Sequence, residues 1–371
     1  MRLINPVLFD AAKQFLAQLS PSDRVAVIHH TDPDGVCSGV IAAKTVEQVR
    51  GKEIDLRFNQ PSSEVSVLSS TVDMLRAQKI THVITTDIAV DDNPLTIRDL
   101  ATFAHVLIID HHKIKTDLSI IPRVIFYKPQ LAFDGIDPSR YCSAKMIFDL
   151  GSTLTDLSSL DFVSAIACIA DVTYMQTKDF VDGVFHKYGI PIIDDVFLTD
   201  LGRCAQYLSH AEAYDIKNVP LCYSIVSSAK KPSDILDSQL KEFDAAIAGE
   251  VEKHNHLLDT QGEKYPDIEL VFYVVESPYN IKSNLSTISS MKRQHTTIFI
   301  ASSHNGMMYF SARRQDRKIA VNDLIENCTR GLSGASGGGH IPAAGGKCTI
   351  ADWPAFKRRV VEELRGKYGS S

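Results

Sequence analysis

The chain has 371 residues, of which 44% are hydrophobic and 23% charged, and its formal net charge is -6. This composition argues against wholesale disorder. The negative charge argues against a protein that coats long duplex nucleic acid, because such proteins present a basic face. No apolar run is long enough for a membrane span and the N-terminus lacks a signal-peptide pattern, so we expect a cytoplasmic protein. At roughly 150 residues per domain, the length predicts two domains.

Short apolar runs alternate with amphipathic runs in the first half of the chain. The apolar runs predict strands at residues 25–28, 54–58, 81–87, 105–110 and 124–129. The amphipathic runs predict helices at residues 36–49, 65–78 and 95–103, followed by a mostly helical region over residues 143–207. Strands separated by helices of this length indicate an α/β fold with a doubly wound, mainly parallel sheet.

The composition changes after residue 228. Charged residues and apolar residues at helical spacing predict one long connecting helix from Pro232 to about Gly262. Further strands are predicted at residues 268–276, 296–303 and 307–314, and a glycine-rich segment and a closing helix follow them. We therefore expect a first domain over residues 1–227, a connecting helix and linker over 228–265, and a smaller C-terminal α/β domain over 266–371.

Metal-binding side chains follow three of the predicted strands. They are His30, Asp32 and Asp34 after the first strand, Asp87 after the third, and Asp110, His111 and His112 after the fourth. Asp171 lies in a later helical run. Because an open parallel sheet binds ligands at the carboxyl ends of its strands, we expect these groups to meet at one edge.

Carboxylates gathered in one pocket repel one another and need cations to hold them. A mixed Asp/His set suits manganese, zinc or iron better than calcium. Each motif has a simpler interpretation when taken alone. The Asp32-Pro33-Asp34-Gly35 segment could be an ordinary turn, Asp87 could cap a helix, and the adjacent histidines could lie in a surface loop. Their joint occurrence favours a metal site with enough ligands for two ions.

The four motifs, HTDPDG, TTD, Asp110-His111-His112 and IADVTY, resemble the successive motifs of the DHH phosphoesterase superfamily. That superfamily includes RecJ-type nucleases, nanoRNases, 3'-phosphoadenosine 5'-phosphate phosphatases, cyclic dinucleotide phosphodiesterases and family II pyrophosphatases. The resemblance implies two manganese ions, with magnesium, cobalt or zinc as alternative metals.

The resemblance also implies a role for each residue. Asp32 serves one metal and Asp34 the other, Asp87 bridges them, and His111 and Asp171 complete the second site. His112 contacts the scissile phosphate, and Asp110 orients a histidine. Where several branches of the family place a metal-binding histidine, this chain has Ile28. We expect His30 to replace it, with His29 as the weaker alternative.

A glycine-rich segment, SGASGGGHIPAAGG, spans residues 333–346. Taken alone, it is typical of a flexible linker. It nevertheless lies between a predicted strand and a helix, and glycines let backbone amides approach a phosphate closely. The segment resembles the G-G-G-H motif of the DHH-associated C-terminal domain. That resemblance implies substrate binding by Gly337, Gly338, Gly339 and His340, with Arg313 from the preceding strand.

We therefore expect a manganese-dependent phosphodiesterase, an exonuclease or nanoRNase, that hydrolyses short single-stranded oligonucleotides or dinucleotides to nucleoside monophosphates with metal-activated water. The acidic charge disfavours long polyanions. The alternatives are a cyclic dinucleotide phosphodiesterase, a 3'-phosphoadenosine 5'-phosphate phosphatase, and a non-enzymatic replication scaffold. The sequence does not determine the exact substrate or the polarity with which an oligonucleotide is degraded. A homodimer and replication or repair partners are further hypotheses.

Overall fold

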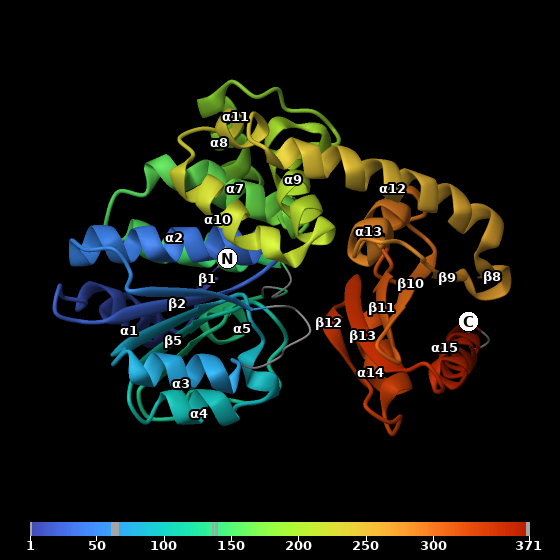
Figure 1. Ribbon diagram of the computed structural model, residues 1–371, viewed down its shortest axis with the longest axis horizontal. Helices are drawn as coiled ribbons and strands as arrows, with labels where there is room; N and C mark the ends of the chain where they lie inside the picture. The colour runs from blue at the N-terminus through green and yellow to red at the C-terminus, as the bar shows by residue number, and fades with distance from the viewer. Residues whose placement is uncertain (1, 61–66, 136, 138–139, 369–371) are drawn as a thin grey trace. The chain divides into compact units, whose positions relative to one another are not determined.

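The computed structural model describes residues 2–60, 67–135, 137 and 140–368. The chain divides into two compact units (Figure 1). The first comprises the chain through Glu212 together with Ile216–Asp244, and the second comprises Ala213–Asp215 together with the chain from Ala245 onward. The division after Asp244 lies within residues 228–265, the segment expected to connect the domains, whereas Ala213–Asp215 lie outside that segment. The functional domain boundaries expected from the sequence remain a proposal.

A five-stranded parallel sheet forms the centre of the first unit. Its order is β3 (Leu56–Gln60), β2 (Val25–His30), β4 (His82–Thr86), β5 (His105–Ile109) and β6 (Val124–Tyr127). The expected α/β class with a parallel sheet is therefore confirmed. Alternate residues of the central strands enter two different hydrophobic cores, one on each face of the sheet. This burial on both faces explains why the strands appear in the sequence as continuous apolar runs.

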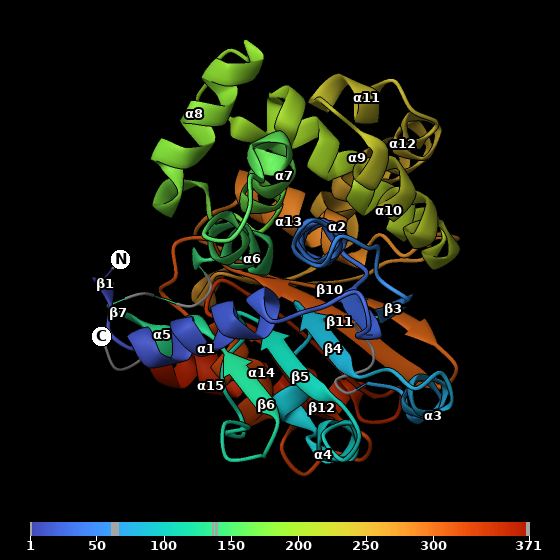
Figure 2. The same ribbon diagram turned by 90° about the vertical axis from the view of Figure 1, so that its left-hand side faces the viewer.

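Helices cover both faces of this sheet (Figure 2). One face packs against α1 (Pro6–Ala17), α2 (Pro33–Arg50), α6 (Ser143–Ser152) and α7 (Asp161–Ala170). The other face packs against α3 (Ser69–Ala77) and α4 (Leu95–Leu100). The helix expected at residues 65–78 is α3, and residues 65 and 66 lie outside the described residues.

The remaining elements of the first unit are peripheral to the sheet. They are β1 (Arg2–Leu3), which pairs with β7 (Phe133–Asp134), and the helices α5 (Pro129–Ala132), α8 (Lys178–Tyr188), α9 (Asp200–Tyr214), α10 (Val219–Ser228) and α11 (Pro232–Leu236). The single connecting helix expected from Pro232 is wrong in one respect, because α12 begins only at Leu240 and runs to Gln261. Between α11 and α12, the Ser238 hydroxyl donates to the Ile235 carbonyl at 2.6 Å and accepts from the Leu240 amide at 3.3 Å. These local bonds interrupt the helix.

A mixed six-stranded sheet forms the second unit, in the order β12 (Ser336–His340), β13 (Ala343–Thr349), β11, β10, β9, β8. The expected strands are β9 (Leu270–Val274), β10 (Thr297–His304) and β11 (Met307–Arg313), and α13 (Lys282–Lys292) joins the parallel pair β9 and β10. The short strand β8 (Glu263–Tyr265) forms the edge. The helices α14 (Val321–Thr329) and α15 (Trp353–Tyr368) complete an aromatic core around Phe299 and Phe310.

The glycine-rich segment forms a β-hairpin rather than the linker that it suggests when taken alone. Strand β12 (Ser336–His340) pairs antiparallel with β13 (Ala343–Thr349). Glycine is required here by close packing. A Cβ atom at Gly337 would lie 2.1 Å from Cγ2 of Ile325, and one at Gly346 would lie 2.6 Å from the Phe310 ring. The missing side chains therefore allow the hairpin to pack tightly against its neighbours.

Within the part of the chain that the structure describes, no helix combines the length and the apolarity that crossing a membrane requires.

Candidate metal centre

The first motif turns directly from β2 into α2. Asp32 is the N-cap of α2, and its Oδ1 accepts a hydrogen bond from the Gly35 amide at 2.8 Å. Pro33 occupies the first helical position, which its fixed φ angle favours. The turn is tight, because a Cβ atom at Gly35 would lie 2.4 Å from the His30 Cβ. The remaining oxygen of Asp32, Oδ2, is thereby held 3.1 Å from Nδ1 of His30.

The two histidines of this motif point to different environments. His30 faces the carboxylates, with its Nδ1 3.6 Å from Oδ2 of Asp87. His29 is fully buried, and its Nε2 lies 3.2 Å from the Arg57 guanidinium. Burial lowers the pKa of His29 to about 3. Of the two, only His30 is placed beside the acidic cluster.

Asp34 is fully buried in the first turn of α2. Its two oxygens accept hydrogen bonds from the backbone amides of Ser143 and Ala144, both at 2.8 Å. These amides form the N-terminus of α6, where unpaired N–H groups favour an anion. Even so, burial raises the pKa of Asp34 well above its usual range, and the nearby carboxylates of Asp87 and Asp171 raise it further.

Asp87 lies at the centre of the cluster, directly after β4. Its backbone has φ 62°, a left-handed conformation that aspartate tolerates better than most residues. Its Oδ1 lies 3.3 Å from Nε2 of His111 and accepts a hydrogen bond from the Ser143 hydroxyl at 3.2 Å. Burial alone would raise the pKa of Asp87, but hydrogen bonds from His111 and His30 hold it well below its usual range.

The Asp110-His111-His112 motif follows β5. His112 Nδ1 lies 2.6 Å from Oδ1 of Asp110, so this carboxylate fixes the orientation of the ring. His111 turns the other way, and its Nε2 lies 3.1 Å from Oδ2 of Asp171. Burial lowers the pKa of His111, but the carboxylates of Asp171 and Asp87 outweigh burial and raise this pKa well above its usual range.

Asp171 ends α7 as its C-cap, so its expected place within a helix is wrong. The Thr173 amide donates to the Cys168 carbonyl and the Val172 amide to the Ile169 carbonyl, as in a Schellman motif. Val172 therefore takes a left-handed conformation, with φ 56°, at a position that normally holds glycine. Burial raises the pKa of Asp171 to about 7.

The first unit thus brings together all the residues expected to bind metal. Three groups have ligand atoms within 4.8 Å of one another: His30 with Asp32 and Asp87, Asp34 with Asp87 and His111, and Asp87 with Asp110 and His112. Asp87 belongs to all three groups. Clustered carboxylates, of which Asp34 and Asp171 have raised pKa values, and imidazole nitrogens at this spacing fit borderline divalent cations such as manganese or zinc.

Three contributions to the site were not anticipated from the sequence. The α6 amides that hold Asp34 give no local signal, because their partner is more than a hundred residues away in the chain. The same is true of Glu212, whose Oε1 accepts a hydrogen bond from the Thr31 hydroxyl at 2.5 Å. The third is Lys128, which directly follows β6. Its place after a strand end is the same signal that marks Asp87 and Asp110.

In the second unit, Arg313 and His340 lie in one row across the sheet. Both are register partners of Ala343, Arg313 from β11 on one side and His340 from β12 on the other. Paired residues of antiparallel strands project to the same face, and strands are about 4.8 Å apart, so both side chains lie on one face about two strand spacings apart. Arg313 is held by α13, where its guanidinium donates to the hydroxyls of Thr287 and Ser283, both at 3.3 Å.

Glycines form the floor beside this row. Gly338 and Gly345 are paired and lie two residues from His340 and Ala343, on the same face. A Cβ atom at Gly338 would meet nothing within 4 Å. Gly337 and Gly339 project to the opposite face, where Gly337 packs against Ile325. Only alternate glycines of the segment therefore leave backbone open beside Arg313 and His340.

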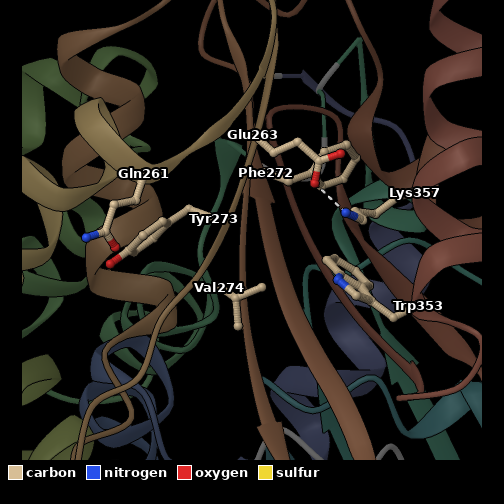
Figure 3. Close-up of a pocket in the computed structure, with 7 residues that line it drawn as sticks. All are labelled: Gln261, Glu263, Phe272, Tyr273, Val274, Trp353 and Lys357. Carbon is tan, nitrogen blue, oxygen red and sulfur yellow. Dashed lines mark hydrogen bonds and ion pairs between the residues drawn. The ribbon is translucent and has the colours of Figure 1, made fainter.

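A separate hollow lies beside β8 and β9 of the second unit (Figure 3). Phe272, Val274 and Trp353 line it, together with an ion pair between Lys357 and Glu263. None of the predicted substrate-binding residues contributes to it, and its charged groups already neutralise each other.

The sequence profile of the DHH family, N-terminal domain, matches residues 24–205, and that of the DHHA1 domain matches residues 270–366. No protein with curated annotation matches significantly. The fold is similar to RecJ in complex with Mn2+ from Thermus thermophilus, with a TM-score of 0.69 and 17% identity over 98% of this chain and 55% of that chain. The chain thus spans about half the length of that RecJ.

Two further solved structures share the fold. One is an exonuclease RecJ bound to manganese, with a TM-score of 0.67 and 17% identity over 98% of this chain and 95% of that one. The other is the DHH domain of a member of a family of ribosomal proteins, with a TM-score of 0.74 and 14% identity over 97% and 90% of the two chains. At these identities the likeness concerns the fold.

Proposed function

The chain belongs to the DHH superfamily and carries a DHHA1 C-terminal domain, and from that premise we propose that it is a manganese-dependent phosphodiesterase. Its substrates are short single-stranded oligonucleotides or dinucleotides, which it hydrolyses to nucleoside monophosphates. The observation that carries this proposal is the buried cluster in which Asp87 is shared by groups of Asp and His ligands. The solved RecJ structures with manganese add support for the metal.

We assign two ions to this cluster. His30, Asp32 and Asp87 would hold one, and Asp34, Asp87, His111 and Asp171 would hold the other. The position of His30 beside Asp32 favours it over His29 as the histidine of the first site. When bound, divalent ions supply electrophilic stabilisation of charge on the phosphoryl group and lower the pKa of water.

His112 would bind the scissile phosphate. Because Asp110 accepts from Nδ1, the imidazole keeps its proton there and Nε2 remains for a phosphate oxygen. Burial lowers the pKa of His112, but the Asp110 carboxylate outweighs burial and raises it. A raised pKa favours the imidazolium form, which would donate a charge-assisted hydrogen bond to the phosphate.

The second unit would bind the part of the substrate beyond the scissile phosphate. Arg313 and His340 offer donors for a phosphate from one row of the sheet, and the open backbone at Gly338 lets a ligand lie close. The net charge of -6 favours a short substrate over long nucleic acid.

The same groups could also serve a cyclic dinucleotide or 3'-phosphoadenosine 5'-phosphate, and these are the competing substrates. A replication scaffold is the non-enzymatic alternative. The presence of Asp34, Asp87, His111 and Asp171 in one buried cluster argues against it, since a scaffold needs no such costly arrangement of carboxylates. A cytoplasmic location and replication or repair partners remain proposals.

A substrate panel with manganese tests the proposal. Product analysis would follow pApA, five-nucleotide RNA and DNA, a cyclic dinucleotide and 3'-phosphoadenosine 5'-phosphate. We expect release of nucleoside monophosphates from the short linear substrates. Preferential turnover of the cyclic dinucleotide or of the bisphosphate would replace our substrate, and no hydrolysis of any member would favour the scaffold.

A further inference from the structure

A fully buried lysine lies behind the Asp110-His112 pair. Lys128 is the first residue after β6, and its side chain has no exposed surface. Its Nζ lies 2.7 Å from Oδ2 of Asp110 and 2.8 Å from Oδ1 of Asp91, which is also buried. Burial lowers the pKa of Lys128, but the carboxylates of Asp110 and Asp91 outweigh burial and raise it. The lysine is therefore charged between two carboxylates.

Lys128 reaches His112 by two routes. Through Oδ2 it holds the same Asp110 carboxylate whose Oδ1 binds Nδ1 of His112. Directly, its Nζ donates to the His112 carbonyl at 3.1 Å, and Gln130 donates to the same carbonyl at 2.9 Å. Both the ring and the backbone of His112 are thereby tied to the end of β6 and to α5.

Asp91 occupies the far side of the lysine and has a different task. Its Oδ2 accepts hydrogen bonds from the Lys115 amide at 2.7 Å and the Thr116 amide at 3.4 Å. These bonds hold the loop that follows the histidine motif rather than the ring of His112. Asp91 and Asp110 thus share one lysine, but it is Asp110 that leads to the candidate phosphate-binding histidine.

We propose that Lys128 is a positioning residue for the hydrolytic reaction, which orients the imidazole of His112 toward the substrate phosphate by fixing the Asp110 carboxylate and the His112 backbone. This inference rests on the proposed function and names a residue that the family motifs do not include. A buried lysine that served only to neutralise buried acids would stabilise the fold and leave turnover unchanged. The two roles therefore predict different kinetics.

A charge-matched double variant separates the two roles. Asp91→Asn/Lys128→Met removes one buried negative and one buried positive charge, so the net charge of the three-residue network is unchanged, which limits the loss of stability. The matched control is Asp91→Asn alone, which breaks the same ion pair but keeps Lys128 on Asp110. We expect kcat to fall roughly ten- to a hundredfold in the double variant, the usual effect of losing an orienting partner, and to stay near the wild-type value in the control. Metal content should be equal in both proteins.

Coupling to His112 is the second readout. In a His112→Ala background the Lys128→Met change should cost no further kcat, because residues that act through one another are not additive. Independently of turnover, the proton on His112 Nδ1 should give a downfield NMR resonance in the magnesium-loaded wild type and control, and this resonance should move in the double variant. Wild-type kcat in the double variant, or an unmoved resonance, would overturn the inference. A wild type that hydrolyses no substrate would refute the proposed function instead, and the resonance would still decide the role of Lys128.

Discussion

The acidic cluster of the first unit and the glycine hairpin of the second are built on opposite principles. In the cluster, side chains from several parts of the chain are buried and contact one another. Asp87, for example, lies against three of them, His30, His111 and Ser143. In the hairpin, the glycines have no side chains. Their absence leaves the backbone open at Gly338 and allows close packing at Gly337.

This difference separates the residues expected to take part in hydrolysis from those expected to bind the substrate. Interlocked carboxylates place a high negative charge where cations can neutralise it, so each member affects all the others. An open backbone floor beside the donors of Arg313 and His340 can hold phosphate without taking part in its hydrolysis. We therefore expect changes in the cluster to affect every substrate, and changes in the hairpin to depend on the substrate.

Metal removal should have the largest effect. Exhaustive chelation should abolish turnover, with manganese restoring it best, and full activity after chelation would contradict the cluster's proposed role. Manganese should also raise the thermal midpoint, because a ligand that binds only the folded state stabilises it. Asp34 and Asp171 have raised pKa values and must lose protons to bind metal, so the rise in the midpoint should be larger at pH 8 than at pH 6.

The Asp87→Ala variant should have the second-largest effect. Loss of the shared ligand should reduce kcat by more than about a thousandfold on every substrate, because several kcal/mol of transition-state stabilisation depend on the metals. Steady-state assays with metal analysis would measure this. Retention of more than about a tenth of the wild-type rate would mean that Asp87 does not organise the cluster.

Arg313→Ala and His340→Ala should have smaller and substrate-dependent effects. The kcat/KM for short oligonucleotides should fall roughly ten- to a thousandfold, since an oriented phosphate contact is lost, while metal content stays unchanged. The loss should be smaller for bis-p-nitrophenyl phosphate, which offers little to grip. Equal losses on both substrates would place His340 in the chemistry, and no loss on either would remove the hairpin from substrate binding.

Two neighbouring glycines provide a matched test of the hairpin. Gly337→Ala should destabilise the protein by about 1–3 kcal/mol, because the new Cβ would collide with Ile325. Gly338→Ala should cost less stability, since its Cβ has open space, but it should weaken oligonucleotide binding. Urea unfolding and substrate titration would measure the two effects. Equal stability losses in both variants would show that the two faces of β12 do not differ as described.

Val172→Gly should have the smallest effect and the opposite sign. A β-branched residue in a left-handed conformation costs roughly 1–2 kcal/mol, and glycine at this helix end avoids that cost. The greater freedom of glycine in the unfolded chain offsets part of the gain, so we expect a net stabilisation of about 1 kcal/mol in urea unfolding. Destabilisation would mean that the Val172 side chain makes contacts worth more than the strain.

Much of the fold followed from local patterns. The five parallel strands of the first unit and strands β9, β10 and β11 of the second lie within a few residues of the expected positions, because apolar runs of this length are typical of buried strands. The break before Leu240 was missed because a single serine forms it, and helical spacing continues on both sides. The glycine hairpin was missed because glycine has low strand propensity, and packing against Ile325 and Phe310 is what requires it.

The sequence by itself determined which side chains could form the site, since His30, Asp87 and Asp110 each end or follow a parallel strand and such ends must meet at one edge of a sheet. Only the tertiary structure decided how these groups are held. Asp34 rests on the amides at the start of α6, and Lys128 joins Asp110 to Asp91. The physical reason is the range of the forces involved. The periodicity of strands and helices depends on residues that are close in the sequence. Buried charges instead pair with residues from distant parts of the chain, and these pairs form only when the core is packed.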